Sequence, residues 1–260
     1  MNRVESAVRS VLGAVPLELI RESGSTVYRA AGVGIVRVER DGLAQIAVAR
    51  ALHSAGAPVP GLLGDACVVG GLTVSIWEDV ADDGSLDARA MGSALRSFQE
   101  VGTRLDVLGA ITLGRFDPVG WLTRRLEGAT TDLARALLDR AGSLALPPGE
   151  TVLHTDAHAG NFRVSGGRAV LVDLEQVALG PALYDLAALE VTERRFRGDR
   201  AIFERFAAAF GADPADPALA QLIALREVLA VGFVAGLGHL DVARNRLAQL
   251  DDRAARWDPF

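Results

Sequence analysis

Strand-like and helix-like patterns are unevenly divided along the chain, and this division limits its fold more than any other feature. In the first 77 residues, short runs of alternating or β-branched side chains are separated by turn residues, as in an antiparallel sheet. Apolar residues at helical spacing predict helices over 4–12 and 43–54 in the same part. The strands are expected at residues 17–22, 27–30, 34–40, 66–69 and 72–77, the last two joined by a Gly70-Gly71 hairpin.

Helical patterns dominate the rest of the chain, after an acidic, turn-rich segment from Glu78 to Ser85. One β-rich island interrupts them from Thr151 to Val177, with a hairpin turn over 165–168. We therefore predict an α+β fold with two lobes: a small antiparallel β lobe with one inserted helix over 1–80, and a larger helical lobe over 81–260. The helices of the second lobe are expected at about residues 87–107, 118–127, 130–145, 182–196, 199–210 and 217–252.

The basic residues carry a chemical consequence because all 27 are arginine and the chain holds no lysine. Schiff-base chemistry, a P-loop lysine and the usual strand lysine of protein kinases are therefore excluded. The formal charge of −6 and the lack of a basic run argue against nucleic-acid binding. Residues 81–260 hold 20 Arg and 25 Asp or Glu, a balance that weakly favours a cationic small-molecule substrate.

Three features bear on the compartment of the protein. Cys67 is the single cysteine, which excludes a disulfide framework and fits a reducing compartment. Glu5 and Arg9 lie where a secretory leader needs an apolar core. The uncharged stretch Val228–Leu240 is shorter than the roughly 18 residues that a membrane span requires. We predict a cytoplasmic protein without a membrane span, whose oligomeric state the sequence leaves open.

The β-rich island concentrates the residues that can carry chemistry. The apolar strand Val152-Leu153 leads into a polar loop, and the following hairpin returns the chain beside that loop. Asp156, Asn161 and Asp173 can therefore meet at one place and offer two carboxylates and an amide oxygen. Such hard donors suit Mg²⁺ that is bound largely through the phosphates of a nucleotide. A carboxylate left free could then orient a hydroxyl for phosphoryl transfer.

The sequence here resembles the aminoglycoside phosphotransferase and choline kinase superfamily. The segment His154-Thr155-Asp156, followed four residues later by Asn161, is similar to the H-x-D-x-x-x-x-N catalytic loop of that superfamily. Tyr184-Asp185-Leu186-Ala187 resembles its following Y-D-L-A segment, and Ser23-Gly24-Ser25-Thr26 its nucleotide-covering loop. The resemblance covers roughly residues 15–190 and implies a protein kinase-like fold and a small-molecule kinase that uses ATP or GTP with Mg²⁺.

The resemblance also implies roles for individual residues. Asp156 corresponds to the catalytic aspartate, and Asn161 and Asp173 to the metal ligands. The structural support would come from His154, which holds the loop, and from the buried Asp185. The nucleotide would be bound by Ser25, Thr26, Ile35, Arg37, the gatekeeper Trp77, and backbone groups of Glu78 and Val80.

Two positions depart from the pattern of that superfamily. Arg37 stands where the strand lysine would hold the phosphates, and alternation places Ile35 on the same face to cover the adenine. Gln45 stands where a glutamate of the inserted helix would pair with that lysine. A Gln–Arg hydrogen bond is weaker than an ion pair. Three possibilities follow: the nucleotide itself orders Arg37, another acid such as Glu39 contributes, or nucleotide binding is weak.

Several alternatives stay open. The two departures would also fit a nucleotide-binding regulator with little or no catalysis. The His154-x-Asp156-x-His158 spacing could belong to a metallohydrolase, although the chain holds few histidines for a zinc site. The Ser23–Thr26 turn could be a plain hairpin, Asp82 and Asp83 plain hinge solvation, and Cys67 a small core residue.

The acceptor is also open. An aminoglycoside or other cationic antibiotic, which would imply a role in antibiotic resistance, is one candidate. A choline-like alcohol, an amino-alcohol, a sugar or a peptide antibiotic is another. The acids that could line a cationic substrate lie in the later helices and comprise Glu190, Glu193, Asp199 and Asp241. The nearby Arg194, Arg195 and Arg197 are predicted to form a solvated helix end.

Overall fold

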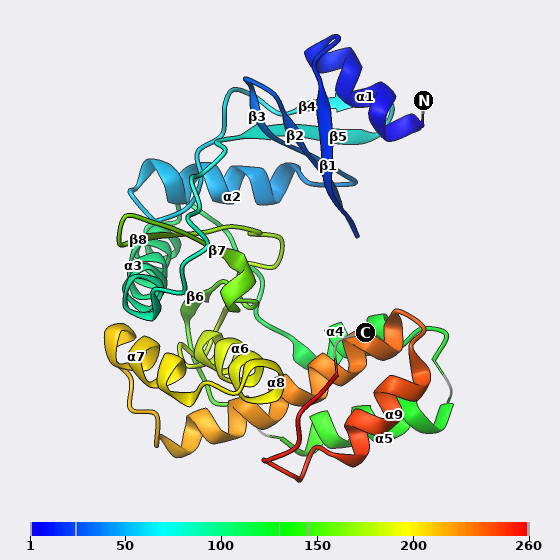
Figure 1. The fold of residues 1–260 in the computed structure, drawn as a ribbon, viewed down its shortest axis with the longest axis vertical. Coiled ribbons are helices and arrows are strands. Elements are labelled where there is room, and N and C mark those ends of the chain that lie inside the picture. Colours follow the sequence, from blue (N-terminus) through cyan, green and yellow to red (C-terminus); the bar gives the residue numbers. More distant parts are fainter. Residues whose placement is uncertain (1, 24, 130, 145, 259–260) are drawn as a thin grey trace.

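A five-stranded antiparallel sheet forms one end of the molecule and a group of helices forms the other (Figure 1). The computed structural model describes residues 2–23, 25–129, 131–144 and 146–258. The strand order is β1-β2-β3-β5-β4. The strands are β1 (Leu17–Ser23), β2 (Ser25–Ala30), β3 (Gly34–Glu39), β4 (Cys67–Val69) and β5 (Leu72–Trp77). The predicted α+β fold with two lobes is thereby confirmed.

The two faces of the sheet differ because side chains alternate along each strand. In β3, Val36 and Val38 are buried, and they pack with Val8 of α1 (Arg3–Leu12) in a small core on the outer face. Ile35 and Arg37 point to the other face and line a cleft. The sheet therefore presents a polar face toward the helical lobe, where α2 (Leu43–Ser54) also lies.

An extra residue in β1 changes which side chains reach that cleft. Glu18 is opposite Arg29 and Arg21 is opposite Val27. The strand β1 therefore advances by three residues over a stretch in which β2 advances by two. Such a β-bulge shifts the alternation of the strand by one residue. The cleft face consequently includes both Glu18 and Arg21, which strict alternation would place on opposite faces.

The beginning of β2 differs from the sequence-based expectation of a turn over 23–26. Ser25 and Thr26 are buried residues of β2, and Thr26 is opposite Glu22 across the ladder. Gly24, at the centre of the expected turn, lies outside the described residues. Cys67 lies in β4 as a strand residue but is exposed, so the prediction of a core position for it is wrong.

The helical lobe holds one continuous core that also receives Leu52 of α2. Its longest helices are α3 (Ala88–Val107) and α8 (Pro217–Gly236): the buried face of the amphipathic α3 packs on the β-rich island, whereas the largely apolar α8 packs on other helices of the lobe. The helices are α3 (Ala88–Val107), α4 (Pro118–Arg125), α5 (Thr131–Ser143), α6 (Tyr184–Thr192), α7 (Arg200–Phe210), α8 (Pro217–Gly236) and α9 (Leu240–Ala248).

The helix predicted over 217–252 is wrong as a single element, because α8 and α9 are separated at Gly238. That glycine has φ of 88°, a left-handed conformation that ends a helix at little cost only for glycine. By length and composition alone, α8 could cross a membrane. However, 56% of its most apolar window is buried inside the protein, as in a core helix of a globular protein.

The β-rich island forms two separate ladders. A tight hairpin joins β7 (Phe162–Ser165) to β8 (Arg168–Leu171), as the Ser165–Arg168 turn predicted. The other ladder pairs β6 (Thr151–Leu153) with β9 (Ala178–Gly180), a strand that the sequence pattern did not indicate. Between β8 and β9 the chain passes back beside the loop that follows β6, so the two polar segments of the island are brought together.

The acidic segment between the lobes contacts the β7–β8 hairpin. The Asp83 backbone N–H donates to the Val164 carbonyl at 2.8 Å, and the carboxylate of Asp82 accepts from the Val164 N–H at 3.3 Å. The Asp83 carboxylate also accepts from the Gly166 N–H at 3.3 Å. The prediction that these acids only solvate a hinge is therefore wrong, since they connect the hinge to the β-rich island.

Candidate active site

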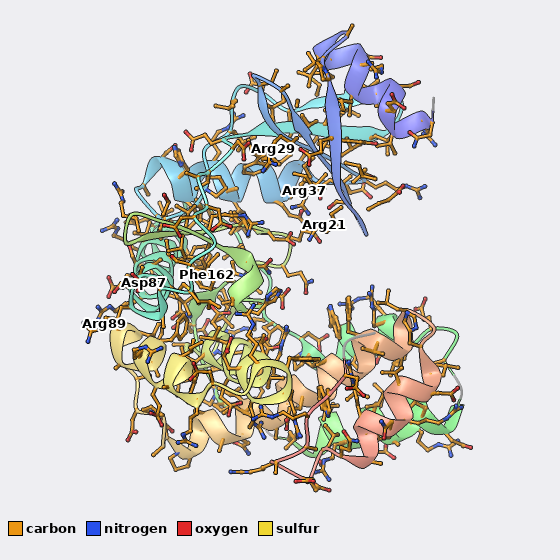
Figure 2. The ribbon with its side chains drawn as sticks, viewed as in Figure 1. Arg21, Arg29, Arg37, Asp87, Arg89 and Phe162 are labelled. Atoms are coloured by element: carbon orange, nitrogen blue, oxygen red, sulfur yellow. The ribbon has the colours of Figure 1, made fainter. Side chains whose placement is uncertain are left out.

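The cleft between the sheet and the helical lobe holds a cavity of about 980 Å³, within the range of small-molecule sites. It opens beneath the polar face of the sheet, where Arg21, Arg29 and Arg37 lie (Figure 2). The sequence-predicted site residues that line this cavity are Ile35, Arg37, Gln45, Trp77, Glu78, Val80, Asn161 and Asp173. Segments that are far apart in the chain therefore meet at one cavity.

Asp185, the second residue of α6, fixes the backbone of the loop that follows β6. Its carboxylate accepts hydrogen bonds from the backbone N–H groups of His154 at 2.9 Å and Thr155 at 2.7 Å. Gln99 of α3 donates to the same carboxylate at 2.9 Å. Burial raises the pKa of Asp185, while these donors and His154 oppose the rise.

This support allows the loop an unusual backbone. Thr155 has φ of 68°, a conformation that costs a β-branched residue energy and persists only where the surroundings impose it. The His154 ring is fully buried, and its Nε2 lies 2.9 Å from the Val172 carbonyl of the returning chain. The strained loop and the returning segment are thus fixed relative to one another.

Asp156 and Asn161 lie together at the end of this loop. The Asn161 side-chain amide donates to the Asp156 carbonyl at 2.9 Å and to its carboxylate at 3.3 Å. Asn161 is buried, whereas the Asp156 side chain is 35% exposed and can be approached from outside. The His158 Nδ1 accepts from the Gly160 N–H at 3.0 Å, as a loop hydrogen-bonding residue should.

Asp173 follows β8 and faces the arginines of the sheet. Its carboxylate accepts from Arg21 at 2.6 Å and from Arg37 at 3.2 Å. Burial would raise the pKa of Asp173, but the hydrogen bonds and charges of these two arginines outweigh it and hold the pKa below its usual value. Asp173 is therefore an ionised carboxylate that faces the arginines of the sheet.

Arg37 is held by acids rather than by the inserted helix. It contacts Glu39 at 3.2 Å, and it also pairs with Glu175. Gln45 of α2 instead donates to the Glu175 backbone carbonyl at 2.7 Å. The expected Gln45–Arg37 hydrogen bond is absent from the described part of the chain, so Gln45 fixes the segment that carries the partners of Arg37.

The remaining predicted nucleotide contacts lie on the interior strands β2, β3 and β5 and in the segment that follows β5. Ile35 is directly opposite Trp77, whose indole N–H donates to Ser75 at 2.9 Å. The Glu78 N–H donates to the Gly61 carbonyl, whereas the described residues show no hydrogen bond to the Glu78 carbonyl or from the Val80 N–H. Buried Ser25 donates to Glu175 at 3.1 Å, while Thr26 does not line the cavity.

Two arginines of the site were not singled out by the sequence analysis. Arg21 reaches the cleft because of the bulge in β1, and no local residue pattern predicted this bulge. Arg226 reaches Asp156 from α8, about 70 residues later in the chain, and contacts its carboxylate. The missing lysine was the only available signal, because every cationic role in this chain must be filled by arginine.

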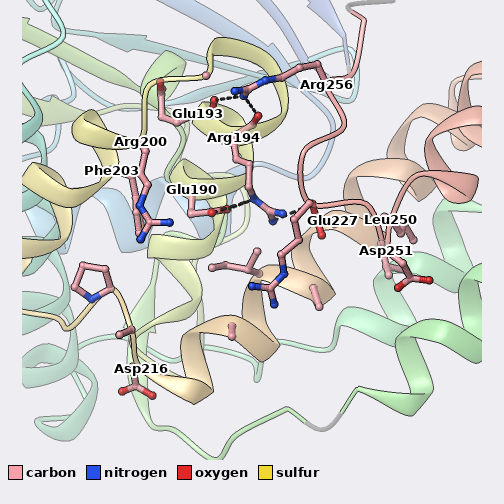
Figure 3. Close-up of a pocket in the computed structure, with 18 of the residues that line it drawn as sticks. Glu190, Glu193, Arg194, Arg200, Phe203, Asp216, Glu227, Leu250, Asp251 and Arg256 are labelled. Carbon is pink, nitrogen blue, oxygen red and sulfur yellow. Dashed lines mark hydrogen bonds and ion pairs between the residues drawn. The ribbon is translucent and has the colours of Figure 1, made fainter.

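The acids expected to form a cationic-substrate wall have other partners, among which Figure 3 shows the Arg194 partner of Glu190. Glu190 pairs with Arg194 at 3.0 Å, and Glu193 lies 3.6 Å from Arg197. Asp241 pairs with Arg244 at 2.9 Å. Arg195, predicted to be solvated, is fully buried and pairs with Glu227. The prediction of a solvated helix end is wrong for Arg195, because backbone carbonyls at Leu250, Asp252 and Ala255 surround its guanidinium group. The acidic wall for a cationic substrate stays a prediction.

Asp199, the remaining acid of that set, caps helix α7. Its carboxylate accepts from the backbone N–H groups of Ala201 at 3.0 Å and Ile202 at 3.4 Å. We expect Asp199→Ala to lower the free energy of unfolding by about 1 kcal/mol, measured by urea denaturation. Asp199→Asn keeps the cap and should change stability by only a few tenths. Equal losses in both variants would contradict the capping role.

The sequence model of the Phosphotransferase enzyme family matches residues 21–222. No protein of curated function matches the chain by sequence. A choline/ethanolamine kinase family protein from Mesorhizobium loti has a similar structure with a TM-score of 0.68 and 20% identity, over 96% of this chain and 93% of that one.

Two further solved structures resemble the whole chain. Amicoumacin kinase hAmiN, in complex with AMP-PNP, Ca²⁺ and Ami, has a TM-score of 0.72 and 13% identity over 98% of this chain and 96% of its own. A thermostable mutant of aminoglycoside phosphotransferase APH(4)-Ia, in a ternary complex with AMP-PNP and hygromycin B, has a TM-score of 0.70 and 18% identity over 97% and 98%.

The fold is thus that of the protein kinase-like small-molecule kinases. Since the family match spans most of the sequence, the chain belongs to the Phosphotransferase enzyme family. It is a small-molecule kinase, and the resemblance predicted from the His154–Asn161 segment is confirmed.

Proposed function

We propose that the protein transfers the γ-phosphoryl group of ATP or GTP to a hydroxyl group of a small molecule, with Asp156 as the catalytic residue. The observation that carries this proposal is the meeting of Asp156, Asn161 and Asp173 beneath a sheet face that bears Arg21 and Arg37. Phosphoryl transfer needs cationic groups on the phosphates and an acceptor for the hydroxyl proton, and this arrangement offers both. We also propose that the nucleotide-binding lobe ends near residue 80.

The arginines have a clear task in this proposal. The phosphates of the nucleotide would take over the guanidinium groups that now contact Asp173 and Glu175. Guanidinium forks bind phosphate oxygens in bidentate fashion, so arginine can replace the lysine that this chain lacks. Ile35 and Trp77 would cover the base, and the Glu78 carbonyl and Val80 N–H would bind its edge.

A divalent cation fits the residues that are present. Asn161 uses its amide nitrogen for Asp156, which leaves its side-chain oxygen without a hydrogen bond among the described residues. Together with the Asp173 carboxylate, this oxygen makes a hard donor set suited to Mg²⁺. When bound there, Mg²⁺ would neutralise the charge of the phosphates. Asn161 and Asp173 would hold it once Arg21 and Arg37 turn to the nucleotide.

The experiment that separates this proposal from a non-catalytic regulator is a thermal unfolding assay with ATP, with and without Mg²⁺. A ligand at about 100 times its Kd stabilises a fold by roughly 2.7 kcal/mol, which raises Tm by several degrees. We expect the increase to require Mg²⁺ and to be lost in Asp173→Asn. The exposed Asp132→Asn variant should behave as the wild type does.

The possible results lead to different conclusions. Equal stabilisation with and without Mg²⁺ would favour the regulator, and no stabilisation by any nucleotide would contradict both functions. A cationic antibiotic remains one candidate acceptor because APH(4)-Ia was solved with hygromycin B. The acids that favoured such an acceptor are, however, engaged elsewhere.

A further inference from the structure

Arg226 is the cationic group nearest to the proposed catalytic carboxylate. It extends from α8, ion-pairs with the Asp156 carboxylate, and donates to the Thr155 carbonyl at 3.4 Å. The buried Tyr184 hydroxyl is a third partner of the guanidinium. Burial would lower the pKa of Arg226, but Asp156 and Tyr184 outweigh it and raise the pKa, so the side chain is always charged.

This contact lies outside the nucleotide cavity. Asp156, Tyr184 and Arg226 do not line the cavity that holds Asn161 and Asp173. The side chains of Asp156 and Arg226 are nevertheless 35% and 21% exposed, so a second molecule can reach the pair. If Asp156 orients the acceptor hydroxyl, the atoms next to that hydroxyl must come close to Arg226.

The acids that could offset this positive charge are committed elsewhere. Glu227, the next residue of α8, pairs with Arg194 at 2.9 Å and with buried Arg195. Glu190 pairs with Arg194. His158 also lies close to Asp156, at 3.6 Å, and burial lowers its pKa. A cationic group beside the reacting hydroxyl would therefore lie next to the guanidinium of Arg226. These acids would not be available to neutralise the repulsion between the two positive charges.

The Asp156–Arg226 pair is complementary to a particular kind of molecule. A ligand that carries a hydroxyl and a nearby anionic group can replace both partners, because the hydroxyl donates to Asp156 while the anion accepts from Arg226. Arginine binds carboxylate and phosphate oxygens in the same bidentate manner. We propose, on the basis of the phosphotransferase function above, that the acceptor carries a carboxylate or phosphate beside its reacting hydroxyl, and that Arg226 binds this group.

The test measures Mg²⁺- and ATP-dependent ADP release with three matched sets of acceptors. The carboxylate arm contains D-glycerate and L-malate, and the phosphate arm contains glycerol phosphate. The uncharged counterparts are glyceramide, malamide and glycerol, and the cationic set contains choline, ethanolamine and hygromycin B. We expect the best anionic acceptor to exceed its uncharged counterpart at least tenfold in kcat/KM, and the two arms to separate a carboxylate from a phosphate.

Variants identify the residue responsible. Arg226→Met should raise the KM of the anionic acceptor more than tenfold and abolish its advantage over the uncharged counterpart, and Arg226→Lys should restore part of it. Arg135→Met, which removes an exposed arginine of α5, is the control for charge. Arg226→Lys also serves if the methionine variant fails to fold, since a changed acceptor preference remains measurable in it.

Specific results would overturn the inference. The inference would be wrong if uncharged or cationic acceptors had a kcat/KM equal to or above that of the anionic acceptors. An Arg226 variant that slows all acceptors equally would overturn it as well, because the residue would then only position Asp156. No turnover of the anionic set, with normal Mg·ATP binding, would refute the anionic acceptor alone. Failure to bind Mg·ATP would instead refute the proposed function.

Discussion

Asp156→Asn should lower kcat by about 10²–10³-fold, a loss of roughly 2.7–4 kcal/mol in transition-state stabilisation. The substitution keeps the size of the side chain but removes the charge that would accept or orient the hydroxyl proton. The KM for the nucleotide should change little, because Asp156 does not line the nucleotide cavity. Steady-state ADP release with a turned-over acceptor measures both parameters.

Two further variants control for the loss of charge. Asp156→Asn leaves Arg226 without its carboxylate, so folding is checked by circular dichroism and urea denaturation. Asp156→Glu retains a carboxylate and a partner for Arg226. Its kcat should lie between that of the wild type and that of Asp156→Asn. Asp132→Asn removes an exposed carboxylate of α5 and should leave kcat unchanged. Wild-type turnover by folded Asp156→Asn would remove Asp156 from the catalytic role.

Arg37→Ala should raise the KM for the nucleotide more than tenfold, a loss above about 1.4 kcal/mol. Arg37 lies on the cleft face of β3 among Glu39, Asp173 and Glu175, and its removal leaves these carboxylates facing the phosphates. The loss therefore combines a missing attraction with a new repulsion. Arg37→Lys restores one charge and should recover part of the affinity.

Arg21 tests whether the two arginines act together. Both contact Asp173 and Glu175, so their effects on nucleotide KM should not be additive in a double-mutant cycle. The double alanine variant is expected to raise the nucleotide KM by less than the product of the two single-variant factors, and an increase equal to that product would mean that the two arginines act independently. An unchanged KM in Arg37→Ala would mean that another group holds the phosphates.

The elements predicted well from the sequence are those with a local signal. Helix α2 begins and ends at the predicted residues, and the Gly70-Gly71 and Ser165–Arg168 turns produce their hairpins. The convergence of Asp156, Asn161 and Asp173 at one place also followed from a short chain segment. In each case, residues within about 20 positions determine the geometry, and the roles of the site residues stay predictions.

The features that the sequence could not predict depend on distant contacts. The bulge in β1 re-aims Arg21 by adding one residue, although Leu19 and Arg21 look like regular strand positions. Arg226 is one of a few polar residues on a largely apolar helix, and only tertiary packing brings it to Asp156. Arg195 looks like part of a charged surface, but backbone carbonyls at Leu250, Asp252 and Ala255 bury it.

The formation of a phosphate ester is the central claim, and ³¹P nuclear magnetic resonance of the reaction tests it most directly. The wild-type protein is incubated with Mg·ATP and an acceptor that stimulates ADP release. The proposed function predicts one new phosphate-ester resonance for each ADP formed, and its loss in Asp156→Asn. ADP that appears together with inorganic phosphate alone, or an ester that forms equally in Asp156→Asn, would contradict it.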